Sequence, residues 1–337
     1  VDSETGKTIP YEGAGFEIYN ADGEKMTMMY SYPSPTAIDV FYTNSEGYLI
    51  TPEVLPYGEY SLVEVQAPYG YVLDKTPVSF SVSSENAEEE NSLTIVKVEK
   101  QNTAQKGKIS VHKTGDIFTS VATASSAYTN ENGEMIVNPT TYTPVFANGD
   151  LSGAVFQITA KEDIVTLDGT IRAYAGDVVS EITTDENGYA ETEPLYLGKY
   201  EVREIKAPYG YVLNNEPKDV ELTYAGQEFE VRDTVNTAFE NEYQSVRISL
   251  SKVMESDEQF GIYGNDYYTS VRFGLFAAED ITAADGSVIP ADGLISEVSL
   301  DENMTAKFDV QIPFGRYYVQ EIATDEHYVL NLSLIHI

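Results

Sequence analysis

Three glutamates occur where the surrounding pattern calls for apolar side chains. Tyr200, Val202 and Glu204 lie two residues apart in a segment that reads as a β-strand, so their side chains share one face of a sheet. The same pattern recurs twice in the chain, at Tyr60, Leu62 and Glu64 and at Tyr317, Val319 and Glu321. Each copy therefore places a carboxyl group on a face that otherwise carries apolar side chains.

Lysine and asparagine side chains occupy comparable positions on other predicted strands. Two segments place a lysine in an apolar row, Ile109, Val111 and Lys113 in one and Ile248, Leu250 and Lys252 in the other. Two segments do the same with an asparagine, Val235, Phe239 and Asn241 in one and Val96, Val98 and Asn102 in the other. Lys100 interrupts the row that leads to Asn102.

A buried amine, a buried carboxyl group and a neighbouring amide can react with one another. An isolated buried charge is costly, and burial lowers the pKa of a lysine and raises the pKa of a glutamic acid. The neutral amine is then a nucleophile, and a protonated carboxyl group can polarise the amide carbonyl and shuttle protons. The product is a Lys–Asn isopeptide bond with loss of one ammonia, formed once by proximity within the folded core. The same residues could instead form buried ion pairs or extend their charged ends to the surface.

The elements that would hold these side chains are three copies of one unit. YSLVEVQAPYGYVL at residues 60–73 recurs as YEVREIKAPYGYVL at residues 200–213 and, more diverged, as YYVQEIATDEHYVL at residues 317–330. Within each copy, Tyr, Val, Ile and Phe alternate with polar residues over short runs bounded by turn sequences, and long helical periodicity is absent. Several short antiparallel strands in about 100 residues predict a β-sandwich for each copy.

The copies divide the chain into repeats at residues 1–104, 105–245 and 246–331. Residues 117–151, rich in Thr, Ser, Asn and Ala, are predicted to form a loop or hairpin inserted in the second repeat. Residues 332–337 read like the translation of an adapter used in sequencing libraries, so we set them apart from the fold. Both ends of the chain are expected to be cut, and missing targeting signals then say nothing about where the protein acts.

Composition narrows the classes of function. The 337 residues include 55 acidic and 20 basic side chains, for a net charge of −35. Such a surface repels nucleic acid and anionic lipid, so we expect neither nucleic-acid binding nor direct membrane binding. The absence of cysteine excludes disulfides and thiolate sites. The sequence also lacks an apolar run long enough to span a membrane.

The motifs together resemble a known family. They are the lysines in KISVHKTGD and VRISLSKVM, the segments GAGFEI and SGAVFQI, the glutamate before APYGY and the asparagine in AFENEYQ. They are similar to the Cna B-type repeats, the SpaA-like, prealbumin-fold domains of Gram-positive surface adhesins and pilins. The resemblance covers essentially residues 1–331. It implies an all-β fold of tandem prealbumin-like, Ig-like β-sandwich domains.

The resemblance also implies which residues react. In the second repeat it assigns Lys113, Glu204 and Asn241 to an intramolecular isopeptide triad. In the first repeat Glu64 and Asn102 match, and the lysine is expected just before Val1. In the third repeat Lys252 and Glu321 match, and the asparagine strand is expected beyond residue 331. The third repeat also lacks the APYGY turn and has residues 324–327 in its place.

We therefore expect a mechanical stalk on the outer surface of a Gram-positive bacterium, anchored to the cell wall through a sorting signal outside these residues. A tie between the first and last strands is worth about 5 kcal/mol through the unfolded chain, by analogy with a disulfide that closes a long loop. No cofactor and no metal are expected. Host extracellular matrix or glycans would be bound by parts of the protein outside this chain.

Two other classes of function compete with this interpretation. The 26 tyrosines and the segment at residues 117–151 could form a host-matrix or glycan-binding surface. A glycosidase using paired carboxylates is the enzymatic alternative, but the sequence lacks the usual catalytic motifs and its three histidines have no evident catalytic partner. The DENG sequence at residues 185–188 and the turn at Asp301 are expected to be ordinary hairpin turns rather than calcium sites.

Overall fold

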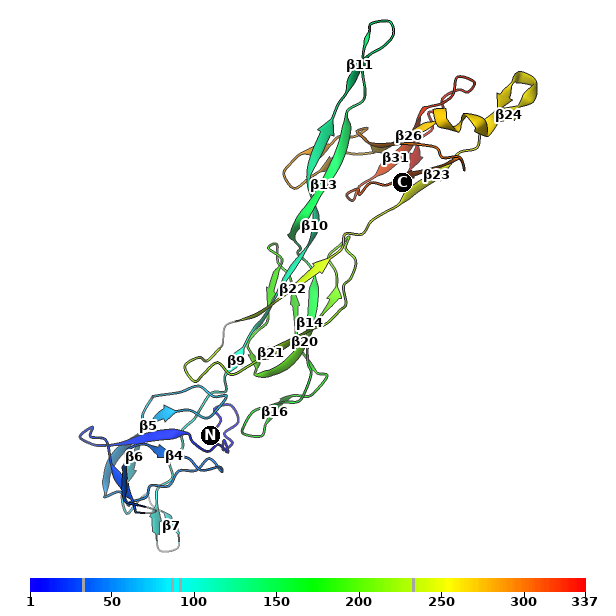
Figure 1. The fold of residues 1–337 in the computed structure, drawn as a ribbon. Helices are drawn as coiled ribbons and strands as arrows, with labels where there is room; N and C mark the ends of the chain where they lie inside the picture. Colours follow the sequence, from blue (N-terminus) through cyan, green and yellow to red (C-terminus); the bar gives the residue numbers. More distant parts are fainter. Residues whose placement is uncertain (32–33, 86–87, 91–92, 232–233) are drawn as a thin grey trace. The chain divides into compact units, whose positions relative to one another are not determined.

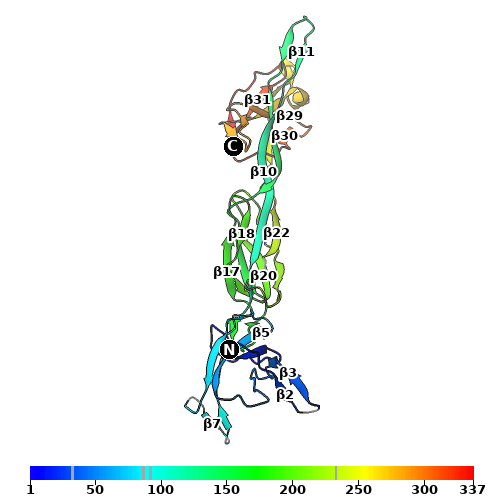
Figure 2. The same ribbon diagram turned by 90° about the vertical axis from the view of Figure 1, so that its left-hand side faces the viewer.

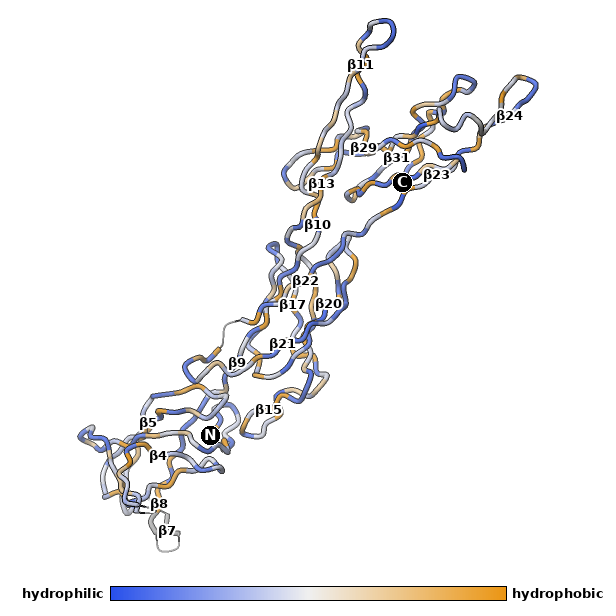
Figure 3. The backbone as a smooth tube through the Cα atoms, in the orientation of Figure 1, coloured by the Kyte–Doolittle hydropathy of each residue, from blue (hydrophilic) through white to orange (hydrophobic). Residues whose placement is uncertain are grey.

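The computed structural model describes residues 1–337 except 32–33, 86–87, 91–92 and 232–233. The described residues form β-strands and two short 3-10 helices and contain no α-helix, which confirms the predicted all-β class (Figure 1). Hydrophilic and hydrophobic residues are interspersed along the chain (Figure 3), and strands such as β14 (Val155–Ala160) alternate buried with partly buried side chains. This alternation is the reason that the segments form sheets with one buried face.

The first repeat is built on a four-stranded antiparallel sheet in the order β4-β1-β5-β6. Its strands are β1 (Gly15–Asn20), β4 (Phe41–Tyr42), β5 (Gly58–Gln66) and β6 (Val78–Val82). Two small hairpins join β2 (Met28–Tyr30) to β3 (Thr36–Ile38) and β7 (Glu88–Glu90) to β8 (Leu93–Ile95). Phe16, Ile18 and Leu62 lie in its core.

The second repeat has an equivalent sheet in the order β17-β14-β20-β21. Its strands are β14 (Val155–Ala160), β17 (Val178–Thr183), β20 (Gly198–Lys206) and β21 (Lys218–Leu222). A second layer consists of β10 (Ile109–Ala124) between β18 (Tyr189–Glu191) and β22 (Val235–Asn241) (Figure 2). Val111, Phe156 and Phe239 belong to one core, so both layers bury side chains against each other. Short pairs join β9 (Lys106–Gly107) to β19 (Leu195–Tyr196) and β15 (Ile164–Val165) to β16 (Ile171–Ala173).

The predicted insertion is a long hairpin. Strand β10 continues past the core and pairs with β13 (Thr141–Asp150), and β11 (Ala127–Thr129) pairs with β12 (Met135–Val137) near the tip. The sequence did not decide between a loop and a hairpin for residues 117–151. The structure has a hairpin there.

The third repeat has a central sheet like those of the other two repeats. In it β26 (Arg272–Ala277) lies between β29 (Leu294–Ser299) and β31 (Tyr317–Ala323). Strand β23 (Ile248–Ser251) pairs with β30 (Thr305–Phe308), and both contribute to the core formed with β26 and β31. The remaining elements are β24 (Ser256–Asp257), η1 (Glu258–Phe260), β25 (Ile262–Tyr263), η2 (Gly264–Ser270), β27 (Ile281–Thr282), β28 (Val288–Ile289) and β32 (Ile335–His336). Strand β32 pairs with β31 and belongs to residues 332–337, whose adapter origin stays a prediction.

Close contacts group the chain into two compact units. One contains residues 1–112, 152–206 and 215–239, and the other contains residues 113–151, 207–214 and 240–337. The first unit thus holds the first repeat together with most of the second. The other unit holds the third repeat with the inserted hairpin and one turn of the second repeat.

Candidate cross-linking site

The lysine and the asparagine of the second repeat meet in the structure. Lys113 continues the row of Ile109 and Val111 on β10, and its side chain is 0 % exposed. Asn241 ends β22 two residues after Phe239 and is 2 % exposed. The Lys113 Nζ donates a hydrogen bond to the Asn241 Oδ1. A buried amine without such a partner would be strongly destabilising.

Glu204 ends the apolar row of β20, as the sequence predicts. It follows Tyr200 and Val202 on the buried face and is 1 % exposed. On β14 its register partner is Phe156, directly after a β-bulge, and the Phe156 ring lies 4.7 Å from the Phe239 ring, centroid to centroid. Glu204 therefore continues a row of side chains in the core that contains Phe156 and Phe239.

The first repeat shows a carboxylate and an amide bound to each other. The Asn102 Nδ2 donates to Glu64 Oε1 and Oε2 at 2.8 and 2.7 Å, and both side chains are buried. The Asp74 backbone N–H donates to Glu64 Oε2 at 3.2 Å. Burial raises the pKa of Glu64 above its ordinary value, and the hydrogen bonds from Asn102 and Asp74 oppose that rise.

Lys100, which interrupts the row leading to Asn102, is itself buried. Its Nζ lies 2.7 Å from Asp74 Oδ2 and donates to the Thr76 carbonyl oxygen at 2.8 Å. This ion pair allows the row to contain a lysine without an isolated charge. The hydrogen bond from Lys100 is the main reason that the pKa of Asp74 is lowered to about 2.

The third repeat shows a carboxylate and an amine bound to each other. The Lys252 Nζ lies 3.1 Å from both oxygens of the buried Glu321 and makes a hydrogen bond to Oε2. The Asn331 backbone N–H donates to the same oxygen at 3.0 Å. Lys252 is only partly buried, so this pair is more accessible to water than the Lys113 site.

All three glutamates are positioned by the same strand register. Each lies opposite a phenylalanine of the neighbouring strand, directly after a β-bulge; the pairs are Phe16 with Glu64, Phe156 with Glu204 and Phe273 with Glu321. The bulge shifts the register so that the carboxyl group faces the core. The FEI, FQI and FGL segments carry these phenylalanines, but the sequence alone did not reveal their role.

Sequence reasoning also missed a positioning tyrosine in each repeat. Tyr71, Tyr211 and Tyr328 follow their glutamates at one fixed offset, which is the signal that could have revealed them. The Tyr211 hydroxyl donates to the Asp116 carbonyl oxygen at 2.7 Å, and the Tyr328 hydroxyl donates to the Glu255 carbonyl oxygen at 2.5 Å. Asp116 and Glu255, the two acceptors, each lie three residues after the lysine of their repeat. The tyrosine hydroxyl therefore holds in place the backbone just after that lysine. Burial raises the pKa of Tyr211 to about 12, so its hydroxyl stays protonated.

The turn before this tyrosine explains part of the motif. In the first two repeats the tyrosine N–H donates back to the proline carbonyl oxygen, Tyr71 to Pro68 at 3.0 Å and Tyr211 to Pro208 at 3.2 Å. The intervening Gly70 and Gly210 have φ of 81° and 87°. This turn needs a positive φ at that position, which glycine adopts without strain.

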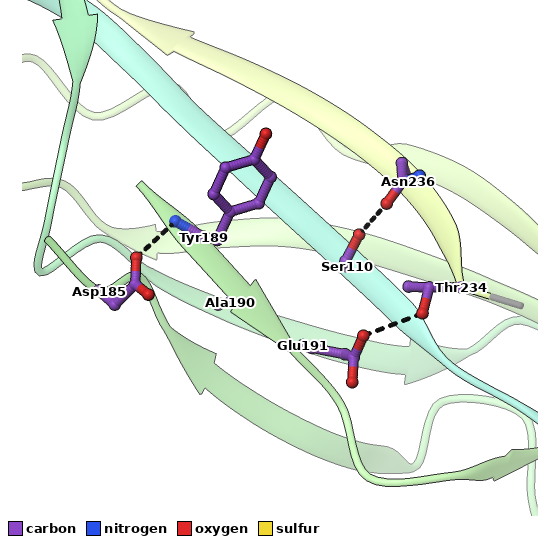
Figure 4. A pocket seen from close by; sticks show the side chains of 7 residues that line it. All are labelled: Ser110, Asp185, Tyr189, Ala190, Glu191, Thr234 and Asn236. Atoms are coloured by element: carbon purple, nitrogen blue, oxygen red, sulfur yellow. Dashed lines mark hydrogen bonds between the residues drawn. The ribbon is translucent and has the colours of Figure 1, made fainter. Parts of the chain in front are cut away.

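The structure also contains an open groove with a volume of about 350 Å³. It is lined by residues of β10, β18 and β22 and the segments beside them, including Ser110, Asp185 and Glu191 (Figure 4). The Ser110 hydroxyl donates a hydrogen bond to the Asn236 side-chain oxygen, and Thr234 donates to Glu191 at 2.9 Å. These polar groups are bound to one another across an open groove, so the groove does not resemble an enclosed catalytic pocket.

Asp185 closes the hairpin turn predicted at the DENG sequence. It accepts hydrogen bonds from the backbone N–H groups of Asn187 and Tyr189. Within the described ranges, no group of three or more His, Asp or Glu side chains is arranged to hold a metal ion. In the same part of the chain, no helix is long and apolar enough to cross a membrane.

The comparison with protein families matches the model of the SpaA prealbumin-like fold domain at residues 1–100 and 146–237, more than half of the chain. The chain belongs to this family. Its fold is therefore a tandem array of prealbumin-like β-sandwich domains, as the motifs predict. The family match gives the fold, and the descriptions as a surface protein and as a pilin subunit belong to two of the relatives named below.

Among curated proteins, the trypsin-resistant surface T6 protein of Streptococcus pyogenes serotype M6 is 30 % identical over 94 residues, which cover 28 % of this chain and 16 % of that protein. Among solved structures, the Bacillus anthracis TIE protein is 22 % identical with a TM-score of 0.57 over 99 % of this chain and 46 % of that one. A variant of BcpA, the major pilin subunit of Bacillus cereus, is 17 % identical with a TM-score of 0.30, over 97 % and 90 % of the two chains. The chain spans less than half of the T6 and TIE proteins.

Proposed function

We propose that this chain is part of an extracellular stalk whose second repeat is locked by a self-formed isopeptide bond between Lys113 and Asn241. The observation that carries the proposal is the hydrogen bond from a fully buried lysine amine to the side-chain oxygen of a buried asparagine. Because neither side chain is solvated, the two groups are held in contact for the lifetime of the fold. Such prolonged proximity is what a slow amide exchange requires.

The reaction balances within the residues of the site. The neutral Lys113 Nζ attacks the Asn241 Cγ, a new C–N bond forms, and the bond from Cγ to Nδ2 breaks. Glu204 lends its proton to the carbonyl oxygen and receives the proton that Nζ loses as the C–N bond forms. It then passes that proton to Nδ2, which leaves as ammonia, and recovers the first proton from the oxygen as the carbonyl re-forms. One ammonia is released, and Glu204 ends in the protonation state in which it began.

A bond between these residues has a direct mechanical consequence. Lys113 lies on the first long strand of the second repeat and Asn241 on its last. Force that enters through one of these strands leaves through the other by way of the new bond. The strands between them then carry no load, and the covalent loop also stabilises the repeat through its unfolded state by about 5 kcal/mol.

The proposal extends to repeats at residues 1–104, 105–245 and 246–331, with a cell-wall-anchored location on a Gram-positive surface. Support comes from family membership and from the T6 relative, which is a surface protein. The cross-link itself is proposed only for the second repeat, because there the described residues supply a lysine, a glutamate and an asparagine. Host matrix or glycan binding by the inserted hairpin stays a prediction.

Single-molecule pulling on the whole chain tests the stalk function. We expect the wild-type chain to show no extension event that corresponds to residues 114–240. The Lys113→Met variant, which removes the nucleophile but keeps an apolar stem, should show that event. If both chains release residues 114–240 under the same force, the mechanical proposal is wrong.

A further inference from the structure

The turn after each glutamate strand contacts more than its own repeat. In the first two repeats it pairs with the chain that leaves the asparagine strand: Tyr71 forms a β-bridge with Ala104, and Tyr211 forms one with Tyr243. Backbone bonds flank each bridge, from Gln105 N–H to the Gly70 oxygen and from Gln244 N–H to the Gly210 oxygen, both at 2.8 Å. The turn therefore holds in place the linker that leads to the next repeat.

After the first turn, Gln105 of the linker is inserted into a loop of the second repeat. Its buried amide donates to the carbonyl oxygens of Gly226 and Phe229, both at 2.7 Å, and accepts from the Ala225 N–H at 2.7 Å. Three backbone groups of this loop, which follows β21, thus depend on one side chain from the linker. The loss of that side chain would leave all three without their partner.

The turn itself also contacts this loop. The Tyr69 ring lies 4.6 Å from the Tyr224 ring, and Leu73 N–H donates to the Gln227 oxygen at 2.8 Å. The first two repeats also share ion pairs, since Arg172 on β16 binds both Asp2 and Glu4. The contact between these repeats therefore combines ion pairs and backbone hydrogen bonds with aromatic contacts.

The second turn meets an aromatic cluster. The Phe314 ring lies 5.1 Å from the Tyr209 ring and 5.3 Å from the Tyr243 ring, and it covers Gly210 so closely that a Cβ there would collide with it. Tyr243 also contacts Phe146 of the inserted hairpin at 5.1 Å. The turn and the linker thus contact Phe314, which lies three residues before β31 of the third repeat, and the hairpin contacts the linker through Tyr243.

The base of the inserted hairpin packs on the same repeat. Phe118, Val121 and Tyr142 cover part of its core. The N–H groups of Ala284 and Asp285 donate to the oxygens of Phe118 and Thr119, each at 3.1 Å. The base of the hairpin is thus held against the third repeat by both apolar packing and backbone hydrogen bonds.

The corresponding turn of the third repeat behaves differently. Residues 324–327 lack the proline and glycine, and the His327 ring stacks on Tyr267 of its own repeat at 4.8 Å. Thus the two turns that carry the Pro-Tyr-Gly sequence bind a following repeat, and the diverged turn binds inward.

We propose that the Pro-Tyr-Gly turn and the linker it clamps form a joint that docks each repeat onto the next copy in the chain, with the inserted hairpin reinforcing the second joint. The partner surface is a polar loop for the first joint and an aromatic cluster for the second. This role goes beyond the cross-link, because none of the residues of the joint takes part in the reaction.

Hydrogen–deuterium exchange on the whole chain tests the first joint, with Gln105→Ala compared with Gln101→Ala, an exposed residue at the end of the first repeat. We expect Gln105→Ala to speed exchange across residues 224–230 and at Leu73 about tenfold, because opening of the joint then costs less. Leu73 is diagnostic, since its bond to Gln227 joins the two repeats and does not involve Gln105. Unchanged exchange at Leu73 would overturn the proposal for this joint.

The second joint is tested with Phe314→Ala and Tyr209→Ala, compared with Phe260→Ala in the exposed 3-10 helix η1. Both test variants should speed exchange of the Val212 and Gln244 amides by about fivefold, the effect of losing one or two aromatic contacts. Tyr209 is 89 % exposed, so its loss cannot act through a weakened core. An effect of Phe314→Ala alone would contradict docking by the turn. The intact mass of each variant reports on the cross-link separately.

Discussion

The three repeats show different pairs among the glutamate, lysine and asparagine that the described residues place in their cores. In the first, the Asn102 amide binds the Glu64 carboxyl group, and in the third, the Lys252 amine binds the Glu321 carboxyl group. In the second, the lysine binds the asparagine directly. The comparison teaches that strand register and the opposing phenylalanine place the glutamate in the same way in all three repeats, whichever group it binds.

The largest effect is expected from removing the asparagine of the second repeat. Asn241→Ala eliminates the acceptor of the proposed bond, so the free energy of unfolding of this repeat should fall by about 5 kcal/mol, measured by denaturant unfolding. Asn236→Ala on the same strand faces away from the core and is the matched control. Equal stability of the two variants would show that Asn241 forms no covalent tie.

Removing the lysine of the third repeat should have a smaller effect. Lys252→Ala leaves Glu321 buried without its charged partner, and because Lys252 is partly exposed we expect a loss of about 2–3 kcal/mol at neutral pH. Lys307→Ala, on the outer face of β30, is the control. Thermal unfolding of the two variants measures the difference. If the loss equals that of Asn241→Ala, the third site is not the simple ion pair that the structure shows.

The first repeat should respond to pH in a defined direction. The pKa of Glu64 is raised by burial above its ordinary value of 4.5, so the neutral form stabilises the fold. This contribution is complete below pH 4.5 and is lost as the pH rises through the folded-state pKa. Asp74, whose pKa is lowered to about 2, has the opposite effect, but only below its ordinary value of 3.8.

The pH dependence is measured by unfolding between pH 4.5 and 7 in the wild type and in Glu64→Gln. We expect the wild type to gain stability toward pH 4.5 relative to the variant, because the raised pKa of Glu64 favours the protonated form in the fold. A wild type whose stability falls toward pH 4.5 relative to the variant would contradict the buried, hydrogen-bonded carboxyl group.

The smallest effect is expected from the positioning tyrosine. Tyr211→Phe removes the hydrogen bond to Asp116 and should cost about 1 kcal/mol, and it should slow the appearance of the cross-linked mass after refolding. Tyr209→Phe in the same turn is the control, because that side chain is exposed. A normal rate in Tyr211→Phe would restrict the hydroxyl to a structural role.

Strand parity was sufficient to place Glu204, Lys113 and Asn241 on buried faces, because a period of two determines which side chains share a face. Parity could not explain Lys100, since its partner Asp74 lies in the irregular segment before β6, 26 residues away in the chain. The same limit applies to the inserted hairpin. Its sequence shows turn chemistry, but its contacts with Ala284 and Asp285 depend on tertiary packing that no local pattern encodes.

The intact mass of the whole purified chain tests the central claim most directly, with Glu204→Gln as the nearly isosteric variant. We predict that the wild-type chain is lighter than its sequence mass by one ammonia and that the variant keeps the full sequence mass. Fragmentation should place the deficit in a peptide that joins the strands of Lys113 and Asn241. A wild-type chain with its full sequence mass would contradict the isopeptide bond and leave the second repeat as a sandwich held by non-covalent contacts alone.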